Sequence, residues 1–308
     1  MALAATAVTF LLIAVGALVR ATGSGEGCSG WPKCSAHSWL PPLAYHPIIE
    51  YSHRMTAFVD IVLVAALAVV ATRDYRETPR LFRMAWLAVA LVFAQAGLGA
   101  VVVKGGLAAL LVTAHFAMAM VLAGVLVYAS VAAFSIDVRI AGPVDGFTWL
   151  ARATAGATFV LMAVGAYVRG QGAGLAFRDW PLMDGRLVPS LSTTPAALQF
   201  THRLLAAIVA VLVIALVVAA RKRLRDRRPA AVLAFVAAGL LAAQVFAGAA
   251  NVWTSLAQPA VVAHVALAGL VWGSLVATAA AARACAARDA SVLEGILVPP
   301  TMAREAST

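Results

Sequence analysis

Residues 47–71 read PIIEYSHRMTAFVDIVLVAALAVVA, an apolar block whose polar side chains gather near its beginning. An α-helix needs about 20 such residues to cross a hydrocarbon layer about 30 Å thick, so the block is long enough to span a membrane. Similar blocks recur along the chain, in which 63% of residues are hydrophobic and 12% are charged. A soluble domain has about 45–50% apolar residues. The sequence therefore predicts an all-α integral membrane protein and excludes a β-barrel, in which apolar and polar residues would alternate.

Eight such blocks predict eight transmembrane helices. They lie at 2–20, 47–71, 81–103, 107–134, 149–168, 195–220, 229–250 and 258–282. The first block lacks the basic start of a signal peptide, so we interpret it as a true span and leave room for residues upstream of Met1. The tail 283–308 has no periodic apolar pattern and is expected to lack regular structure, with Cys285 as a lone thiol.

The net charge of +10 could suggest nucleic-acid binding, but the basic residues gather in short loops between spans. Two of these loops, 72–80 and 221–228, are rich in arginine, and the positive-inside rule places such loops in the cytoplasm. Both termini are then cytoplasmic, and the longer loops 21–46 and 169–194 lie outside. The Ala- and Arg-rich composition favours a bacterial plasma membrane, and we expect no nucleic-acid partner.

A shift of 149 residues aligns the polar and glycine positions of two halves of the chain. The aligned pairs are Gly16 and Gly165, Arg20 and Arg169, Gly23 and Gly172, Gly25 and Gly174, Trp31-Pro32 and Trp180-Pro181, His53-Arg54 and His202-Arg203, Gln95 and Gln244, Gly99 and Gly248, and His115 and His264. Each half holds four predicted spans, an even number, so the halves should point the same way. We predict two tandem four-helix bundles, 1–134 and 149–282, joined by a cytoplasmic linker, 135–148.

Four of the six histidines lie inside predicted spans, where ionisable groups are costly and usually functional. His53 lies about 9 Å and His115 about 12 Å below the outer edge of the membrane, and His202 and His264 repeat this arrangement. Two imidazoles at one depth inside an apolar bundle suit the axial positions of a haem iron. Copper or zinc would need further ligands in the same layer. The pattern predicts one haem site in each half.

Several polar residues near these histidines have two readings. The planar guanidinium group of arginine suits a haem propionate, and the alternative is that these side chains reach the membrane interface and anchor helix ends. The four arginines concerned are Arg20, Arg54, Arg169 and Arg203. Gln95 and Gln244, with the glycines four residues later, are typical of close helix packing.

The two halves differ most sharply at Glu50, which aligns with Gln199. Glu50 lies three residues before His53, so both side chains share one face of a helix. A carboxyl group in this position can exchange protons with a reacting group, which makes Glu50 a catalytic candidate. The alternative is an interfacial glutamate paired with a nearby arginine.

The cysteines of the first outer loop form a second difference. Cys28 and Cys34 align with Phe177 and Met183 in the other half. An extracytoplasmic loop permits a disulfide, and it also permits a thiol pair that exchanges with a partner. A zinc site that adds His37 is a third alternative.

Taken together, these residues resemble the haem A synthase family. The stretches that carry the resemblance are GALVRATGSG at 16–25, GC at 27–28, WPKC at 31–34, IEYSHR at 49–54, TAH at 113–115, QFTHR at 199–203 and AH at 263–264. With the eight spans and the duplication, the resemblance covers residues 1 to about 282.

The resemblance implies an enzyme that oxidises one methyl group of haem O to a formyl group, through a hydroxymethyl intermediate, to give haem A for terminal oxidases. It assigns His53 and His115 to the substrate haem and Glu50 to catalysis. It assigns His202 and His264 to a haem b cofactor that transfers electrons.

By the same resemblance, Cys28 and Cys34 match a family disulfide, although a second pair that some relatives carry in the other outer loop is missing here. The partners implied are haem O, haem A, membrane lipid, a haem O synthase and an electron donor. Two rival functions use the same residues differently: a two-haem electron-transfer protein like cytochrome b, and a transporter without a pigment.

Overall fold

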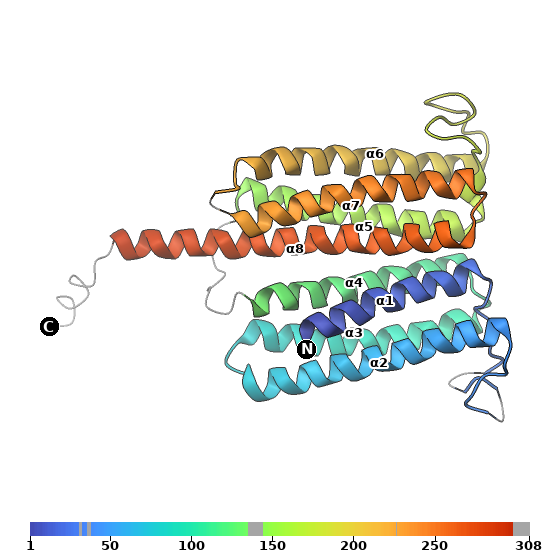
Figure 1. Cartoon of the computed structure of the whole chain (residues 1–308), viewed down its shortest axis with the longest axis horizontal. Coiled ribbons are helices and arrows are strands. Elements are labelled where there is room, and N and C mark those ends of the chain that lie inside the picture. The colour runs from blue at the N-terminus through green and yellow to red at the C-terminus, as the bar shows by residue number, and fades with distance from the viewer. Residues whose placement is uncertain (31–32, 36–37, 135–143, 226, 298–308) are drawn as a thin grey trace.

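The computed structural model describes residues 1–30, 33–35, 38–134, 144–225 and 227–297, with side chains up to residue 284. Within these residues it consists of eight long α-helices and one short 3₁₀ turn, with no β-strand (Figure 1). The helices are α1 (Ala2–Ala21), α2 (Tyr45–Asp74), α3 (Pro79–Lys104), α4 (Ala109–Ala133), α5 (Gly146–Gly170), α6 (Thr194–Arg221), α7 (Arg228–Trp253) and α8 (Gln258–Leu297).

All eight helices are long and apolar enough to cross a membrane. The predicted all-α membrane fold is therefore confirmed. The observed helices extend past several of the predicted ends because the first and last turns carry polar or basic residues, as at Asp74 and Lys104. Such residues suit the interface between lipid and water and still form helical backbone hydrogen bonds.

One sequence-based expectation needs correction. The segment 283–297 is helical, as the end of α8, whereas we expected no regular structure after residue 282. Four of its fifteen residues are alanine and two are arginine, and both residue types have high helix propensity, which does not require an apolar face. Residues 298–308 lie outside the described part of the chain, and so does most of the predicted linker, 135–143.

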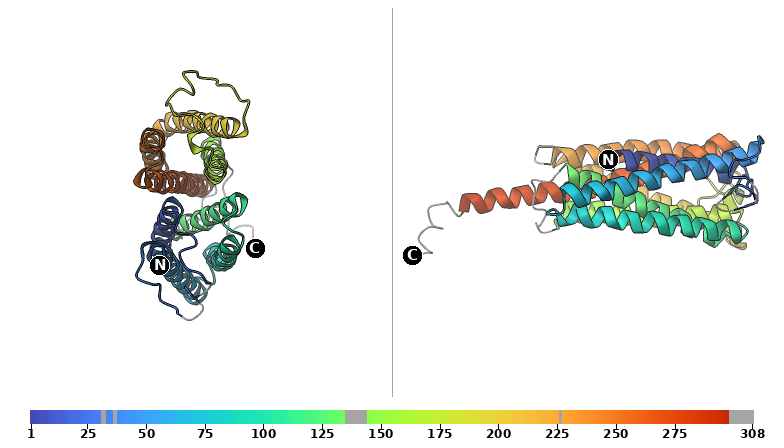
Figure 2. Two further views of the ribbon diagram at one scale, coloured as in Figure 1. Left: turned by 90° about the vertical axis from the view of Figure 1, so that its right-hand side faces the viewer. Right: turned by 90° about the horizontal axis from the view of Figure 1, so that it is seen from below.

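The helices lie in two sets of four, which we name the first half (α1–α4) and the second half (α5–α8) (Figure 2). In the first half α1 contacts α2, α2 contacts α3, α3 contacts α4, and α4 returns to α1. The second half repeats this closed order from α5 to α8. Between the halves, α1 packs on α8, and α4 packs on both α5 and α8.

The contact between the halves depends on close approach at glycines. The ring of Trp272 in α8 lies over Gly124 in α4, where a Cβ atom would be only 2.5 Å from the ring. Trp272 Nε1 donates a hydrogen bond of 2.9 Å to the backbone carbonyl of Ala155. Phe10 of α1 approaches Gly273 of α8 in the same way. Small residues at these points let helices without a polar interface pack tightly in a membrane.

The two long loops, between α1 and α2 and between α5 and α6, lie at the same end of the molecule (Figure 1). The arginine-rich connections after α2 and α6 lie at the opposite end. The four histidines of the helices lie nearer the end with the long loops, because each lies only a few residues after the start of a helix that begins at that end.

Candidate functional site

Each of the four helical histidines lies against a glycine of the preceding neighbour helix. A Cβ atom added at Gly16 would be 3.1 Å from Cε1 of His53. The same distance for the other three pairs is 3.1 Å for Gly99 and His115, 2.8 Å for Gly165 and His202, and 3.2 Å for Gly248 and His264. These glycines, which we had assigned to helix packing or to the repeat alone, therefore make room for the imidazole rings.

Gly16 and Gly165 leave a backbone carbonyl of their own helix facing the ring. The His53 imidazole interacts with the carbonyl of Leu12, and the His202 imidazole interacts with the carbonyl of Leu161. Each carbonyl belongs to the residue one helical turn before the glycine, where a larger side chain would cover it. In metal sites a carbonyl in this position holds one ring nitrogen and turns the other toward the metal.

The Nδ1 atoms of all four rings are buried and lack a hydrogen bond of standard geometry. The rings pair within each half: His53 lies within electrostatic range of His115, and His264 lies within range of His202. The structure thus brings together the two histidines that we predicted for each half, while iron binding stays a prediction.

The glutamines named in the sequence lie beside the second histidine of each pair. Gln95 Nε2 is 3.3 Å from His115 Nε2 and donates to the His115 carbonyl at 3.0 Å. Gln244 Nε2 is 3.4 Å from His264 Nε2. Each amide therefore contacts the ring nitrogen farther from the backbone, and a bound metal would replace that contact.

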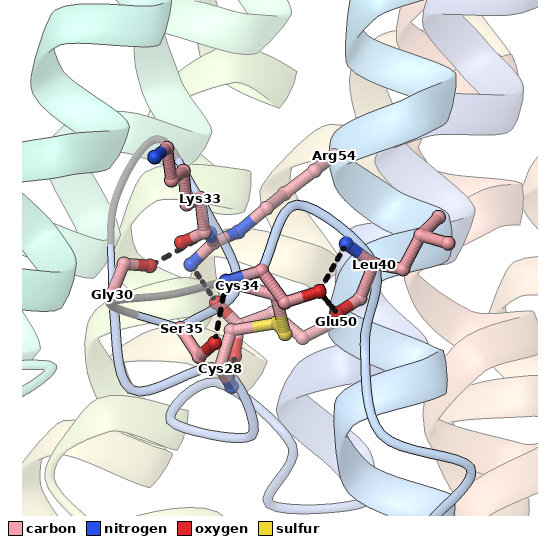
Figure 3. Close-up of a disulfide and its surroundings, with 9 residues drawn as sticks. Cys28, Gly30, Lys33, Cys34, Ser35, Leu40, Glu50 and Arg54 are labelled. Atoms are coloured by element: carbon pink, nitrogen blue, oxygen red, sulfur yellow. Dashed lines mark hydrogen bonds and ion pairs between the residues drawn. A yellow bond between two sulfur atoms is a disulfide. The ribbon is translucent and has the colours of Figure 1, made fainter.

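Glu50 is buried, with 4% of its surface exposed, and holds the first outer loop in place (Figure 3). Its Oε2 accepts a 2.7 Å hydrogen bond from the backbone N–H of Cys28, and its Oε1 forms an ion pair with Arg54. Arg54 also donates to the backbone carbonyls of Gly30, at 2.8 Å, and Lys33, at 3.2 Å. The pairing of Glu50 with an arginine, which we considered as the alternative to catalysis, is thus present.

The second half repeats this arrangement without the charge. Gln199 Oε1 accepts a 2.6 Å hydrogen bond from the backbone N–H of Phe177, and its Nε2 donates to Gly174 at 2.7 Å. Arg203 donates to the backbone carbonyl of Asp179 at 3.1 Å. A glutamine therefore suffices to hold the loop, and the carboxylate of Glu50 adds a charge and a proton-accepting group.

Cys28 and Cys34 form a disulfide, and both are buried. The two sulfur atoms are bonded to each other, so the zinc alternative is wrong. His37, the third residue of that alternative, lies outside the described residues. In the second half the apolar side chains of Phe177 and Met183 occupy the aligned positions and pack in a small core.

The remaining two arginines differ from Arg54 and Arg203. The Nε atoms of Arg20 and Arg169 are buried without a hydrogen-bond partner, and the two guanidinium groups lie within electrostatic range of each other. They end α1 and α5, at the outer end of the molecule. Of the four arginines considered for haem propionates, these two have binding capacity left over.

Sequence reasoning missed one polar residue inside the spans. Asp60 is fully buried in α2 and accepts a 2.8 Å hydrogen bond from Thr9 in α1. It lies in the apolar block 47–71 and aligns with Val209, so the same 149-residue shift that singled out Glu50 could have found it.

Comparison with known proteins adds independent information. The family model described as cytochrome oxidase assembly protein, COX15-CtaA, matches residues 1–276. A Heme A synthase of Symbiobacterium thermophilum is 37% identical over 257 residues, which cover 80% of this chain and 83% of the relative. A Heme A synthase of Shouchella clausii is 31% identical over 251 residues, or 79% and 83% of the two chains. A Heme A synthase of Geobacillus kaustophilus is 30% identical over 284 residues, or 87% and 86%.

Proposed function

We propose that the two halves of this chain have different roles in haem A synthesis. The chain belongs to the COX15-CtaA family of cytochrome oxidase assembly proteins. The chain is an oxidoreductase of the membrane that converts haem O to haem A. In our proposal the first half binds haem O between His53 and His115. The second half holds haem b between His202 and His264.

The residues present fit a haem in each half. Each half offers two half-buried imidazoles in an otherwise apolar setting, with glycines that make room for the rings. Nitrogen ligation by two histidines inside a helix bundle is a usual form of haem binding. Haem b, when bound, would supply electron transfer, so the electron-transfer function that we considered as a rival describes the second half alone.

Arg20 and Arg169 are our candidates for the propionates, because their Nε atoms are buried without partners. A guanidinium group matches a carboxylate with two parallel hydrogen bonds. Arg54 and Arg203 already bind loop carbonyls and are better explained as residues that position the outer loops.

The observation that carries the division of labour is the difference between Glu50 and Gln199. Both side chains hold the backbone of an outer loop, but only the carboxyl group of Glu50 can take up and release a proton. Oxidation of a methyl group to a formyl group releases protons, so the half that retains this group is suited to the reaction. We propose that Glu50 accepts a proton at its carboxylate, while Arg54 and the Cys28 N–H keep that carboxylate at the edge of the site.

Replacing Glu50 with glutamine tests this role directly, because it installs the residue of the second half. We expect Glu50→Gln to keep the loop and to bind haem O, but to lower conversion to haem A by at least about 10²-fold, the size of a general acid–base contribution. The measurement is chromatography of porphyrins extracted from membranes supplied with haem O. Gln199→Glu is the matched control and should leave conversion unchanged, whereas undiminished conversion by Glu50→Gln would contradict the assignment.

We further propose a bacterial plasma membrane location with both termini in the cytoplasm. The arginine-rich ends of α2 and α6 support this orientation through the positive-inside rule. The outer ends of both haem sites then lie near the aqueous space outside the cytoplasm. A haem O synthase that delivers substrate, and a separate electron donor, are the partners that this reaction requires.

A further inference from the structure

Asp60 is a carboxyl group inside the membrane-spanning part of α2 with binding capacity left unused. The residue is completely buried, and its Oδ1 accepts a 2.8 Å hydrogen bond from Thr9 Oγ1. Its Oδ2 is buried and has no hydrogen-bond partner. Leaving a buried polar atom unpaired destabilises the protein, and ionisable residues inside spans are rare and usually functional.

The position of Asp60 relates it to the first haem site. Asp60 follows His53 by seven residues, which is two helical turns, so both lie on one face of α2 with Asp60 about 10 Å farther from the outer end. Both residues meet α1, His53 at Gly16 and Asp60 at Thr9. Asp60 therefore lies two turns deeper than His53 along the same contact between α1 and α2.

A closed apolar core lies at and beyond this level. Its buried residues are Ala5, Val64, Ala88, Val92, Leu122 and Leu126. Asp60 thus lies at the edge of this core, on the side of His53.

The second half has no such group. Asp60 aligns with Val209, which is buried in a hydrophobic core. Thr9 aligns with Thr158, and each hydroxyl contacts the backbone carbonyl four residues earlier, Ala5 at 2.9 Å and Thr154 at 2.8 Å, so only the partner across the helices differs. The deep end of the site is therefore polar in the first half and apolar in the second.

Haem O, proposed for the first half, is likewise more polar at one edge than haem b, proposed for the second half. Haem O carries a hydroxyethyl group, extended by an isoprenoid tail, in place of one vinyl group of haem b. That substituent lies on the part of the porphyrin away from the propionates. If Arg20 holds an anionic propionate, as proposed above, the hydroxyl group of haem O would lie on the opposite, deep side of the ring, toward Asp60.

We infer that Asp60, held by Thr9, accepts a hydrogen bond from this hydroxyl group and makes the first half selective for haem O. This inference rests on the proposed function. A site that hydrogen-bonds a hydroxyl group binds an analogue without that group more weakly, because Oδ2 of Asp60 gains a partner only from haem O. Val209 has no polar atom that needs a hydrogen-bond partner, which suits the apolar vinyl group of haem b.

The test is a comparison of two haems on the purified full-length protein whose second half is loaded with haem b. Haem O or additional haem b (protohaem) is titrated into this protein. The part of the Soret-band change that is lost when His53 is replaced reports binding to the first half. We expect Asp60→Val to weaken haem O binding about tenfold, the effect of one hydrogen bond, and to leave protohaem binding unchanged. Val209→Asp, the matched change in the other half, should not alter haem O binding to the first half.

The role of Asp60 can also be tested on the unmodified protein by changing the ligand. Haem O with its hydroxyl group methylated should bind the unmodified protein about tenfold more weakly than haem O. Equal affinity for these two ligands, or an equal loss of haem O and protohaem binding in Asp60→Val, would overturn the role of Asp60. A missing Soret change with every haem in the unmodified protein would instead overturn the proposed haem site, and this inference with it.

Discussion

Gly165 lies so close to His202 that an added Cβ atom would be 2.8 Å from the ring, a separation that real side chains do not adopt. Gly165→Ala must therefore displace the imidazole. We expect this variant to be inserted and folded but to retain clearly less haem b, because the ring nitrogen leaves the position from which it would bind iron. The measurement is the haem-to-protein ratio, with reduced-minus-oxidised spectra of the purified protein.

Gly156 provides a matched control in the same helix. A Cβ atom there meets nothing within 4 Å, so Gly156→Ala should keep the full haem content and should stabilise α5 slightly, by about 0.5–1 kcal/mol. His202→Ala should lose the haem outright. A Gly165→Ala protein with an unchanged spectrum and haem ratio would show that the glycine does not position the histidine.

At the level of single residues, spacing in the sequence revealed the functional candidates but few of their contacts. The 149-residue shift singled out the four histidines and the difference at Glu50. It did not show that Arg54 binds both Glu50 and the outer loop, because the loop folds back onto α2 only in three dimensions. The contact between Asp60 and Thr9 was missed for the same reason, since it joins two helices that are far apart in the sequence.

Among the helices, α5 shows most clearly how a polar cap fixes an end. Asp145 precedes α5 and accepts hydrogen bonds from the Thr148 backbone N–H, at 3.0 Å, and from Arg227 at the start of α7, at 2.7 Å. Partial burial acts to raise the pKa of Asp145. The hydrogen bonds from Thr148 and the charge of Arg227 outweigh it and hold this pKa below its usual value.

A carboxyl group whose pKa is lower in the folded state stabilises that state above its unfolded pKa and loses this effect as the pH falls through the folded value. Asp145→Asn keeps a capping oxygen but removes the charge, so we expect it to destabilise the protein by about 0.3–1 kcal/mol at pH 7. The difference from the unmodified protein should shrink below about pH 4. Thermal unfolding in detergent at both pH values measures this, with the exposed Asp74→Asn as control. A difference that stays constant over the whole pH range would contradict the role of the charge.

The helices themselves were largely predictable, because a membrane requires long apolar blocks and each block became a helix. Their ends were less predictable, since hydropathy does not report where backbone hydrogen bonds stop. The end of α8 was misjudged for this reason: its helix propensity continues after its apolar character has ended.

On the scale of the whole molecule, the repeat in the sequence corresponds to the same order of helix contacts in each half. How the halves face each other could not be read from the repeat, because a sequence shift carries no information about their relative placement. In the structure α1 and α4 meet α5 and α8, and the second and third helices of each half do not take part in the main contacts between halves. The four helices at this contact include α4 and α8, which carry His115 and His264.

This placement predicts that one substitution between the halves disturbs both sites. Gly124 of α4 lies under the ring of Trp272 of α8, so Gly124→Leu must push these two helices apart. Overpacking of this kind costs about 1–3 kcal/mol. Because α4 and α8 each carry a proposed haem ligand, we expect lower haem occupancy in both halves, whereas Gly165→Ala should affect the second half alone.

Haem O binding and haem b content, measured on the same purified preparation together with its melting temperature, distinguish these cases. Gly97→Leu is the control, because Gly97 is exposed on α3 and a Cβ atom there meets nothing within 4 Å. Loss of haem from only one half in Gly124→Leu would mean that each half holds its histidine pair independently of the contact at Trp272. Loss from both halves at a lowered melting temperature would show that the packing of α4 on α8 sets the ligand spacing of the two sites together.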